Sequence, residues 1–292
     1  MPSESSHTLK TADGATLAWR RSHCDAAAPG VPLVFIHGAA SNMTRWSEFV
    51  ETTTLRETRD LLRIDLRGHA LSMHRGPTSL EIWSDDIAAI LVQENIPRAI
   101  LVGHCLGANV AVMFAARHPD KTAGLVLVEP MLRAALTGTL GHLRPFTPLL
   151  RIAIVAIRLL NRVGLYRRHL EGLDLHTLDR EFRQRLAEPG GIEALVERYA
   201  SPLADLRTMP AANYLQDLVE VMRPLPLERI QAPFLALLSA GRAFADPRLT
   251  RALLSTLPRG EIIDVDAKHW IPTEQPEAMR GAIETWCARL GS

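Results

Sequence analysis

The sequence has few cysteines and almost no excess of charge of either sign. Its three cysteines, Cys24, Cys105 and Cys287, lie far apart in the chain and are odd in number. Such usage is typical of a reducing compartment and not of a disulfide framework, so a cytoplasmic location is expected. The 33 basic and 32 acidic residues almost cancel. Proteins that bind nucleic acid usually carry a basic surface, so we expect no nucleic-acid partner.

Motifs for metals, nucleotide cofactors and export are also missing. The chain has no C-x-x-C pair and no H-E-x-x-H, and its 11 histidines do not cluster at ligand spacing, so no metal is expected. No G-x-G-x-x-G follows an expected strand, so no cofactor is expected. The polar N-terminus lacks the apolar core and small-residue cleavage site of a signal peptide.

No transmembrane segment is expected either. The most membrane-like stretch, residues 148–164, is too short to span a bilayer and is interrupted by Arg151, Arg158 and Arg162. It predicts a buried or half-buried helix. The alternative is an apolar helix that covers a lipophilic site and touches a membrane.

The chain does contain short apolar runs that alternate with helix-like segments. With 292 residues, of which 47% are hydrophobic, it is long enough for one large domain or for a core with an insertion. Runs that are apolar on both faces are typical of a parallel sheet covered by helices, so an α/β fold is predicted. The expected strands are residues 31–36, 61–65, 99–103, 125–128, 234–238 and 261–265.

The helical segments differ between the two parts of the chain. Residues 84–93, with Ser84 as the N-cap, and residues 107–117 predict helices that pack on the sheet. From 131 to 226 the strand pattern disappears and Arg- and Leu-rich helical segments replace it. We therefore predict an α/β core over residues 1–130 and 227–292 with a helical cap inserted at 131–226. The first dozen residues are expected to be loosely ordered.

The motif with the clearest chemistry is Gly103-His104-Cys105-Leu106-Gly107, a G-x-C-x-G between a strand and a helix. A side chain presented on such a sharp turn needs small neighbours two residues away on either side. The helix N-terminus that follows favours the reactive thiolate. Cysteine among small residues is often just buried packing, but the flanking motifs favour Cys105 as a nucleophile.

Two further turns are expected to supply the oxyanion donors and the general base that a nucleophile needs. After the first strong strand, a His37-Gly38 turn points a backbone N–H of Ala39, or of its neighbour Ala40, toward the nucleophile. Ala39 and Leu106 would together bind a developing oxyanion. After the last strand, His269 is the candidate general base, since it follows the nucleophile in the chain order of such sites.

These motifs occur in an order that resembles the α/β-hydrolase family. The resemblance covers nearly the whole chain and implies that fold, in a capped form with a cysteine nucleophile. The Asp65–Ser72 block and Asp86 resemble elements that hold the family scaffold together. The four matching blocks are His37-Gly38, Asp65-Leu-Arg67-Gly68-His69-Ala-Leu-Ser72, Gly103-His-Cys105-Leu-Gly107 and His269-Trp-Ile-Pro-Thr-Glu-Gln-Pro276.

The acid that would orient His269 has two candidates. In the family an acid commonly follows the strand at 234–238 three residues after a glycine, but that position is Phe244 here. Asp246 arrives two residues later and is the preferred candidate. Glu129, after the preceding core strand, is the alternative. Asp264 and Asp266 are expected to be polar residues at a strand edge.

A cysteine nucleophile changes the expected substrates. A thiolate attacks carbonyls readily but is a good leaving group, so thioesters, lactones and activated esters suit it better than amides. The prediction is a hydrolase that acts through an acyl-Cys105 intermediate. The alternative is an acyltransferase or a cyclising thioesterase that passes the acyl group to an alcohol, amine or thiol. Two further alternatives remain, a non-enzymatic binding protein and a cysteine engineered in place of serine.

The expected partner is a small acyl compound, hydrophobic in character, and a carrier-bound thioester is also compatible with this chemistry. The apolar stretch at 152–160 of the predicted cap favours a medium or bulky acyl group. Met43, Trp46, His104 and Trp270 are the candidate substrate-binding residues because they adjoin the functional turns.

Overall fold

The centre of the molecule is an eight-stranded sheet of order β1-β2-β4-β3-β5-β6-β7-β8. This computed structural model describes residues 4–185 and 190–290. The first two strands pair antiparallel with their neighbours, and β3 to β8 run parallel to one another. All six predicted strands are confirmed. The strands are β1 (Glu4–Lys10), β2 (Thr16–Ser22), β3 (Gly30–Ile36), β4 (Arg59–Asp65), β5 (Ala99–His104), β6 (Thr122–Val128), β7 (Phe234–Ser239) and β8 (Gly260–Val265).

The prediction that the first dozen residues are loosely ordered is wrong from Glu4 onward, and residues 1–3 lie outside the described residues. Strand β1 pairs with β2 along its whole length, from Glu4 opposite Ser22 to Lys10 opposite Thr16. Its side chains alternate between exposed and half-buried, and none is fully buried. An edge strand that faces solvent needs few apolar residues, so apolar periodicity does not reveal it.

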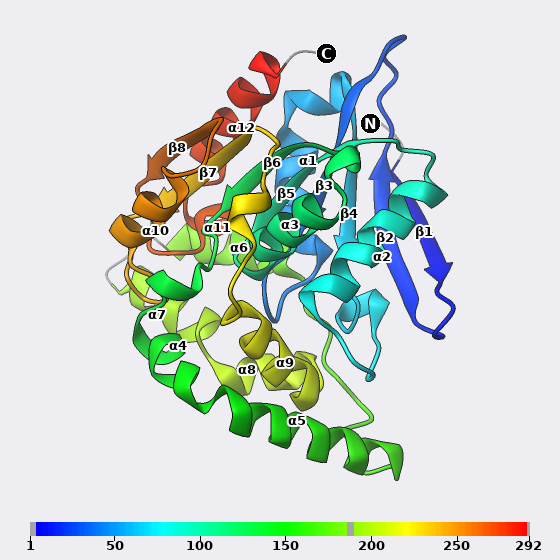
Figure 1. Ribbon diagram of the computed structural model, residues 1–292, viewed down its shortest axis with the longest axis vertical. Coiled ribbons are helices and arrows are strands. Elements are labelled where there is room, and N and C mark those ends of the chain that lie inside the picture. Colours follow the sequence, from blue (N-terminus) through cyan, green and yellow to red (C-terminus); the bar gives the residue numbers. More distant parts are fainter. Residues whose placement is uncertain (1–3, 186–189, 291–292) are drawn as a thin grey trace.

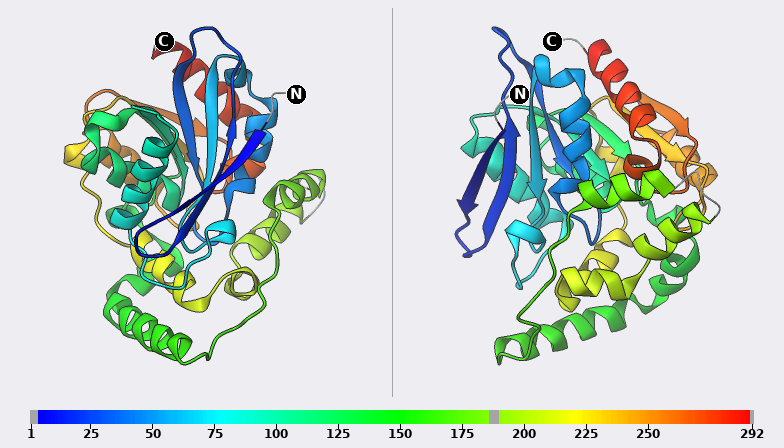
Figure 2. Two further views of the ribbon diagram at one scale, coloured as in Figure 1. Left: turned by 90° about the vertical axis from the view of Figure 1, so that its right-hand side faces the viewer. Right: turned by 180° about the vertical axis from the view of Figure 1, so that it is seen from behind.

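Helices cover both faces of the sheet (Figures 1 and 2). Alternate strand residues point to opposite faces: Val34 and Ile36 pack with the helices α2 (Leu80–Gln93) and α3 (Leu106–Arg117). Leu33 and Phe35 pack with α1 (Ser47–Thr52) and α12 (Pro276–Arg289). These two apolar layers form the core.

Helix α2 begins earlier than predicted. Its N-cap is Ser79, whose hydroxyl accepts from the N–H of Ile82, whereas the predicted cap Ser84 lies fully buried inside the helix. The first turn, Leu80–Trp83, belongs to the helix because Leu80 and Trp83 bury their side chains in the core.

The chain between β6 and β7 is helical, as predicted for the insertion at 131–226. Whether this insertion is a domain of its own stays a prediction. It lies at the end of the sheet opposite to the two termini (Figure 1). Its helices are α4 (Gly138–Leu143), α5 (Thr147–Arg162), α6 (Leu175–Arg185), α7 (Gly191–Tyr199), α8 (Pro202–Thr208) and α9 (Ala211–Val221). Two short helices of the last third, α10 (Pro247–Leu254) and α11 (Ile271–Glu274), flank β8.

The block from Asp65 to Ser72 has the scaffold role expected of it. The Asp65 carboxylate accepts from the N–H groups of Met43 and Leu71 at 2.7 and 3.0 Å. Arg67 donates two hydrogen bonds to the carboxylate of Asp86 at 2.9 and 2.6 Å. These buried contacts hold the loops after β3 and β4 in place. Over residues 4–185 and 190–290, no helix is long and apolar enough to cross a membrane.

Candidate active site

Cys105 sits on the turn between β5 and α3 in a backbone conformation that L-residues rarely adopt, with φ 53° and ψ −115°. Its neighbours must be glycines for steric reasons. A Cβ on Gly107 would lie 2.3 Å from the carbonyl oxygen of Ile36, and a Cβ on Gly103 would lie 2.2 Å from that of Gly107. The two glycines therefore allow the strained turn that presents Cys105, as the motif predicts.

His269 lies in the loop between β8 and α11. The carboxylate of Glu274 fixes this loop, because it accepts from the N–H groups of Lys268, His269 and Trp270 at 2.8, 3.1 and 2.9 Å. The imidazole Nδ1 lies 3.1 Å from Oε2 of Glu129. The other side of the ring faces Cys105, with which it interacts electrostatically.

The charge state of His269 follows from these two partners. Burial alone would lower its pKa, but the hydrogen bonds and charges of Cys105 and Glu129 outweigh burial and raise the pKa to about 10. The imidazole is therefore protonated at neutral pH. An imidazolium held between a sulfur and a carboxylate is the arrangement that a thiolate nucleophile requires.

The preference for Asp246 over Glu129 is wrong. Asp246 caps α10, where its Oδ1 accepts from the N–H groups of Arg248 and Leu249 at 2.8 and 3.4 Å. Glu129 follows β6 with φ 52°, a left-handed conformation that turns its side chain toward His269. Its carboxylate also accepts from the N–H and the hydroxyl of Ser239 at the end of β7. Ser239 thus fixes the Glu129 carboxylate beside His269.

The loop after β3 offers the backbone donors expected of an oxyanion hole. The N–H of Ala40 already donates to Asp217 of α9 at 3.2 Å, so Ala39 is the better donor of the two. Leu106 is the first residue of α3, at the N-terminal end, where backbone N–H groups point out of the helix. Ala39 and Cys105 line the same small cavity.

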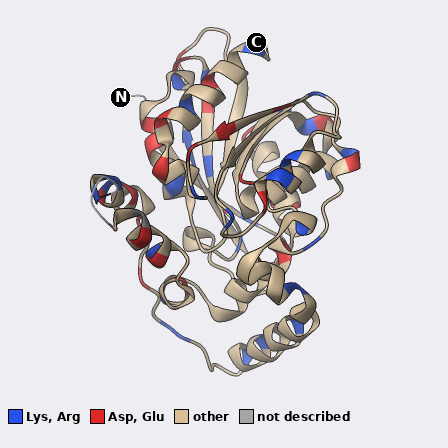
Figure 3. Ribbon diagram, turned by 90° about the vertical axis from the view of Figure 1, so that its left-hand side faces the viewer, with Lys and Arg blue, Asp and Glu red and all other residues tan. Residues whose placement is uncertain are grey.

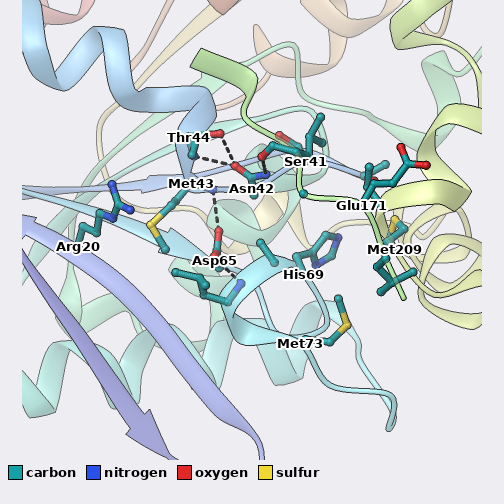
Figure 4. A pocket seen from close by; sticks show the side chains of 17 residues that line it. Arg20, Ser41, Asn42, Met43, Thr44, Asp65, His69, Met73, Glu171 and Met209 are labelled. Carbon is teal, nitrogen blue, oxygen red and sulfur yellow. Dashed lines mark hydrogen bonds between the residues drawn. The ribbon is translucent and has the colours of Figure 1, made fainter. Parts of the chain in front are cut away.

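Two cavities adjoin at this loop. The smaller, of about 60 Å³, is lined by Cys105 and His269 and by two predicted substrate-binding residues, His104 and Trp270. The larger, of about 490 Å³, contains the predicted residue Met43 together with Met73 and Met209. Figure 4 shows it with Asp65 and His69 in its wall. Both cavities share Ala40, Ser41 and Leu173 as lining residues.

The prediction that Trp46 binds substrate is wrong. It is fully buried and packs against Phe35 and Phe49, with ring centroids 5.3 and 6.4 Å away. It belongs to the core layer under α1, because the turn that follows Asn42 directs Met43 toward the cavity and Trp46 toward the sheet.

Comparison with known proteins shows the family to which this chain belongs. The family model described as the alpha/beta hydrolase family matches residues 33–282. The chain belongs to the alpha/beta hydrolase family.

Relatives of this alpha/beta hydrolase include the sn-1-specific diacylglycerol lipase ABHD11 of Mus musculus. It is 26% identical over 272 residues, 90% of this chain and 82% of the relative. A probable alcohol acetyltransferase of Saccharomyces cerevisiae is 23% identical over 266 residues, 86% of this chain and 75% of the relative. The solved structure of a thermophilic esterase from Thermogutta terrifontis matches with a TM-score of 0.70 at 21% identity. The match covers 99% of this chain and 100% of the esterase chain. The predicted α/β-hydrolase fold is thereby confirmed.

This alpha/beta hydrolase also has site residues that the sequence patterns did not indicate. Arg198 and Asp205, from α7 and α8, line the small cavity. Burial raises the pKa of Asp205 to about 7, against the lowering effect of Arg198. Both residues lie in the helical segment, where neither strand-end position nor motif spacing distinguishes a cavity residue from a surface one. Among residues 4–185 and 190–290 no group of three His, Cys, Asp or Glu side chains could hold a metal ion.

A buried polar cluster fastens the helical segment to the alpha/beta hydrolase core beside this site. Arg45 donates to both carboxylate oxygens of Asp179 at 2.7 Å and to the hydroxyl of Thr273 at 2.6 Å. The hydroxyl of Tyr199 also donates to Asp179. The cluster joins the turn before α1, the helices α6 and α7, and α11, and it lies next to the wall that Tyr199 and Trp270 form.

Proposed function

We propose that the protein hydrolyses a carboxylic ester, thioester or lactone through an acyl-enzyme on Cys105, with His269 as acid and base and Glu129 as the orienting acid. The observation that carries this proposal is the convergence of the three residues. The thiol is on a strained turn, and the imidazole that faces it is held at Nδ1 by a carboxylate.

In the first half of the reaction the Cys105 thiolate attacks the carbonyl carbon, and a carbon–sulfur bond forms. The carbonyl oxygen becomes an oxyanion, which accepts hydrogen bonds from the N–H groups of Ala39 and Leu106. When the tetrahedral intermediate collapses, the bond to the leaving group breaks and the His269 imidazolium gives its proton to that group. An acyl thioester on Cys105 and a neutral His269 remain.

In the second half water replaces the leaving group. Neutral His269 takes a proton from water as the oxygen attacks the thioester carbon. Collapse of the second tetrahedral intermediate breaks the carbon–sulfur bond, releases the carboxylic acid and restores the thiolate–imidazolium pair. Glu129 keeps the ring in one orientation throughout and stabilises its charged form.

The larger cavity supports a hydrophobic acyl group. Its three methionines, Met43, Met73 and Met209, form an adaptable apolar surface, and its volume of about 490 Å³ suits a medium-sized ligand. Among the described residues, the wall of the small cavity at Cys105 has no methionine. Its polar lining residues include Arg198, Asp205 and His104. One relative is named a diacylglycerol lipase, and a lipid ester as substrate would agree with an apolar cavity for the acyl group beside a polar cavity at Cys105. A reducing cytoplasm would keep the thiol available.

Acyl transfer is the second candidate function. A relative named as a probable alcohol acetyltransferase supports it. The cavity beside Cys105, about 60 Å³, has room for only a small acceptor once the acyl group is bound. A small alcohol, amine or thiol would then replace water in the second half of the reaction.

Intact mass spectrometry after exposure to a panel of p-nitrophenyl esters and acyl thioesters tests the proposal. We expect a mass increase of one acyl group that is absent in Cys105→Ala and retained in Cys24→Ala. Free acid as the product supports hydrolysis, whereas an ester formed with added ethanol supports transfer. Turnover that persists in Cys105→Ala, or no adduct and no turnover with any member of the panel, would refute the acyl-Cys105 intermediate.

A further inference from the structure

Helix α5 has one face that the fold uses and one that it leaves uncovered. It lies at the end of the molecule and packs against α9 (Figure 1). The residues on its packed side follow helical spacing: Leu150, Ile154, Ile157 and Asn161 are half-buried or buried. Within the described residues, only this side of the helix packs against the rest of the protein.

The opposite side of α5 exposes large apolar side chains. Ile152, Val155 and Leu159 are 66%, 57% and 54% exposed, and Val163 just after the helix is 73% exposed. Their spacing of three and four residues places them on one face. Leu149, Leu160 and Leu165 enlarge this surface, with exposures of 62%, 49% and 65%. A contiguous apolar surface of this kind marks an interaction site in a folded protein.

The charged residues of the segment that contains α5 are all of one sign. Arg151, Arg158 and Arg162 are spaced by seven and four residues, so they lie in a stripe along one side of the helix; Arg151 and Arg162 are exposed, and Arg158 is half-buried. Figure 3 shows basic and no acidic residues along this helix. The 40 residues from 131 to 170 contain no aspartate or glutamate. Their arginines are Arg133, Arg144, Arg151, Arg158, Arg162, Arg167 and Arg168.

We propose that this face of α5 docks on an anionic lipid bilayer, with the helix lying in the plane of the surface. An apolar face beside a stripe of arginines is the arrangement that binds such a surface: the apolar side chains enter the acyl boundary and the guanidinium groups contact the phosphates. A second copy of the chain fits less well. The same segment of a second copy has seven arginines and no carboxylate, so it offers no partner for these charges.

The chain that carries the docking surface continues into the wall of the larger cavity. The chain leaves α5 as an extended segment that returns to the core and leads into α6 (Figure 2). Leu170 and Leu173 of this segment line the 490 Å³ cavity. The docking surface and the cavity wall are therefore parts of one continuous stretch of chain. The docking itself requires no turnover, so it holds whether or not Cys105 acts as proposed.

Vesicle co-sedimentation of the full chain tests the docking. Vesicles of equal parts phosphatidylglycerol and phosphatidylcholine are compared with vesicles of phosphatidylcholine alone, at low and at high salt. Two variants remove the apolar face, Ile152→Glu/Leu159→Glu in the helix and Val163→Glu just beyond it. A third, Arg151→Gln/Arg162→Gln, removes charge. Leu249→Glu and Arg248→Gln on α10 are the matched controls, since both residues are also exposed.

We expect the wild type to bind the anionic vesicles more tightly than the zwitterionic ones, and high salt to weaken this binding. Each removed arginine should lower the partition coefficient by about fivefold, and the apolar variants should lower it by tenfold or more, roughly. The α10 controls should bind as the wild type does. Three results would overturn the proposal: no binding to anionic vesicles, equal binding by α5 variants and controls, or a solution dimer that the α5 variants convert to a monomer.

Discussion

The two candidates for the acid beside His269 were Glu129 and Asp246. They show which site residues motif spacing can predict and which it cannot. Cys105 and His269 were predicted from the sequence because each sits in a short motif at the end of a strand. Glu129 was not preferred, because its contact with His269 joins residues 140 positions apart and depends on a left-handed backbone conformation. No local pattern encodes either fact. Asp246, which does follow the family position approximately, serves its own helix instead.

The two acids give opposite predictions for isosteric substitution. Glu129→Gln removes the charge that stabilises the His269 imidazolium, so we expect kcat to fall by about a hundredfold to ten-thousandfold. Asp246→Asn keeps an N-cap acceptor and does not contact His269, so kcat and the melting temperature should stay near the wild-type values. Steady-state kinetics on an activated ester measures both. A large loss of kcat in Asp246→Asn with none in Glu129→Gln would reverse the assignment.

At the scale of elements, the turn between β5 and α3 depends on Gly107, the glycine at its helical end. A Cβ on Gly107 would lie 2.3 Å from the oxygen of Ile36 and 2.5 Å from that of His37, both backbone atoms that cannot move freely. Gly107→Ala should therefore destabilise the protein by about 3 kcal/mol or more, or prevent folding. Gly281 of α12 has nothing within 4 Å of a built Cβ, so Gly281→Ala should stabilise by up to about 1 kcal/mol. Urea unfolding measures both, and similar effects at the two sites would contradict the steric argument.

Helix α9 is connected to the loop after β3 through a titratable pair. The carboxylate of Asp217 accepts from the N–H of Ala40 and lies 2.8 Å from Nε2 of His69. Burial would lower the pKa of His69, but the charge and hydrogen bond of Asp217 outweigh it and raise the pKa above 6.5. A raised pKa in the folded state means that this pair stabilises the protein fully below pH 6.5. The stabilisation is lost as the pH rises through the raised value.

Asp217→Asn tests this linkage. The loss of unfolding free energy relative to wild type should be largest below pH 6.5 and should shrink as the pH rises, because His69 then loses its proton in both proteins. The measurement is urea unfolding at several pH values. Asp85→Asn, which removes an exposed partner of Arg117 and His118, is the control, and its effect should stay within about 1 kcal/mol. A loss for Asp217→Asn that does not change with pH would exclude the His69 linkage.

At the scale of the whole molecule, the division into a sheet with flanking helices and a helical segment followed from apolar periodicity alone. The strands β3, β5, β6 and β7 are largely buried and apolar on both faces, which makes them visible in the sequence, whereas the solvent-facing β1 is not. The placement of the helical segment on the core could not be predicted. It rests on polar contacts such as Arg45 with Asp179, 134 positions apart, and Asp217 with His69, 148 apart. Such contacts leave no periodic signal in the sequence.

The buried ion pair of Arg45 with Asp179 should therefore decide how firmly the helical segment is attached. Both side chains are almost fully buried, at 4% and 5% exposure, so Asp179→Asn would leave the Arg45 charge buried without compensation. We expect a loss of about 3 to 5 kcal/mol in the free energy of unfolding. Asp264→Asn removes the partner of Arg251 in an ion pair exposed by 40% and 76%, and should cost less than about 1 kcal/mol. Because this ion pair attaches the helical segment to the core, limited proteolysis of Asp179→Asn should cut first within the helical segment, well below the melting temperature. Equal losses in the two variants, or first cleavage within the sheet, would show that apolar packing alone attaches the segment.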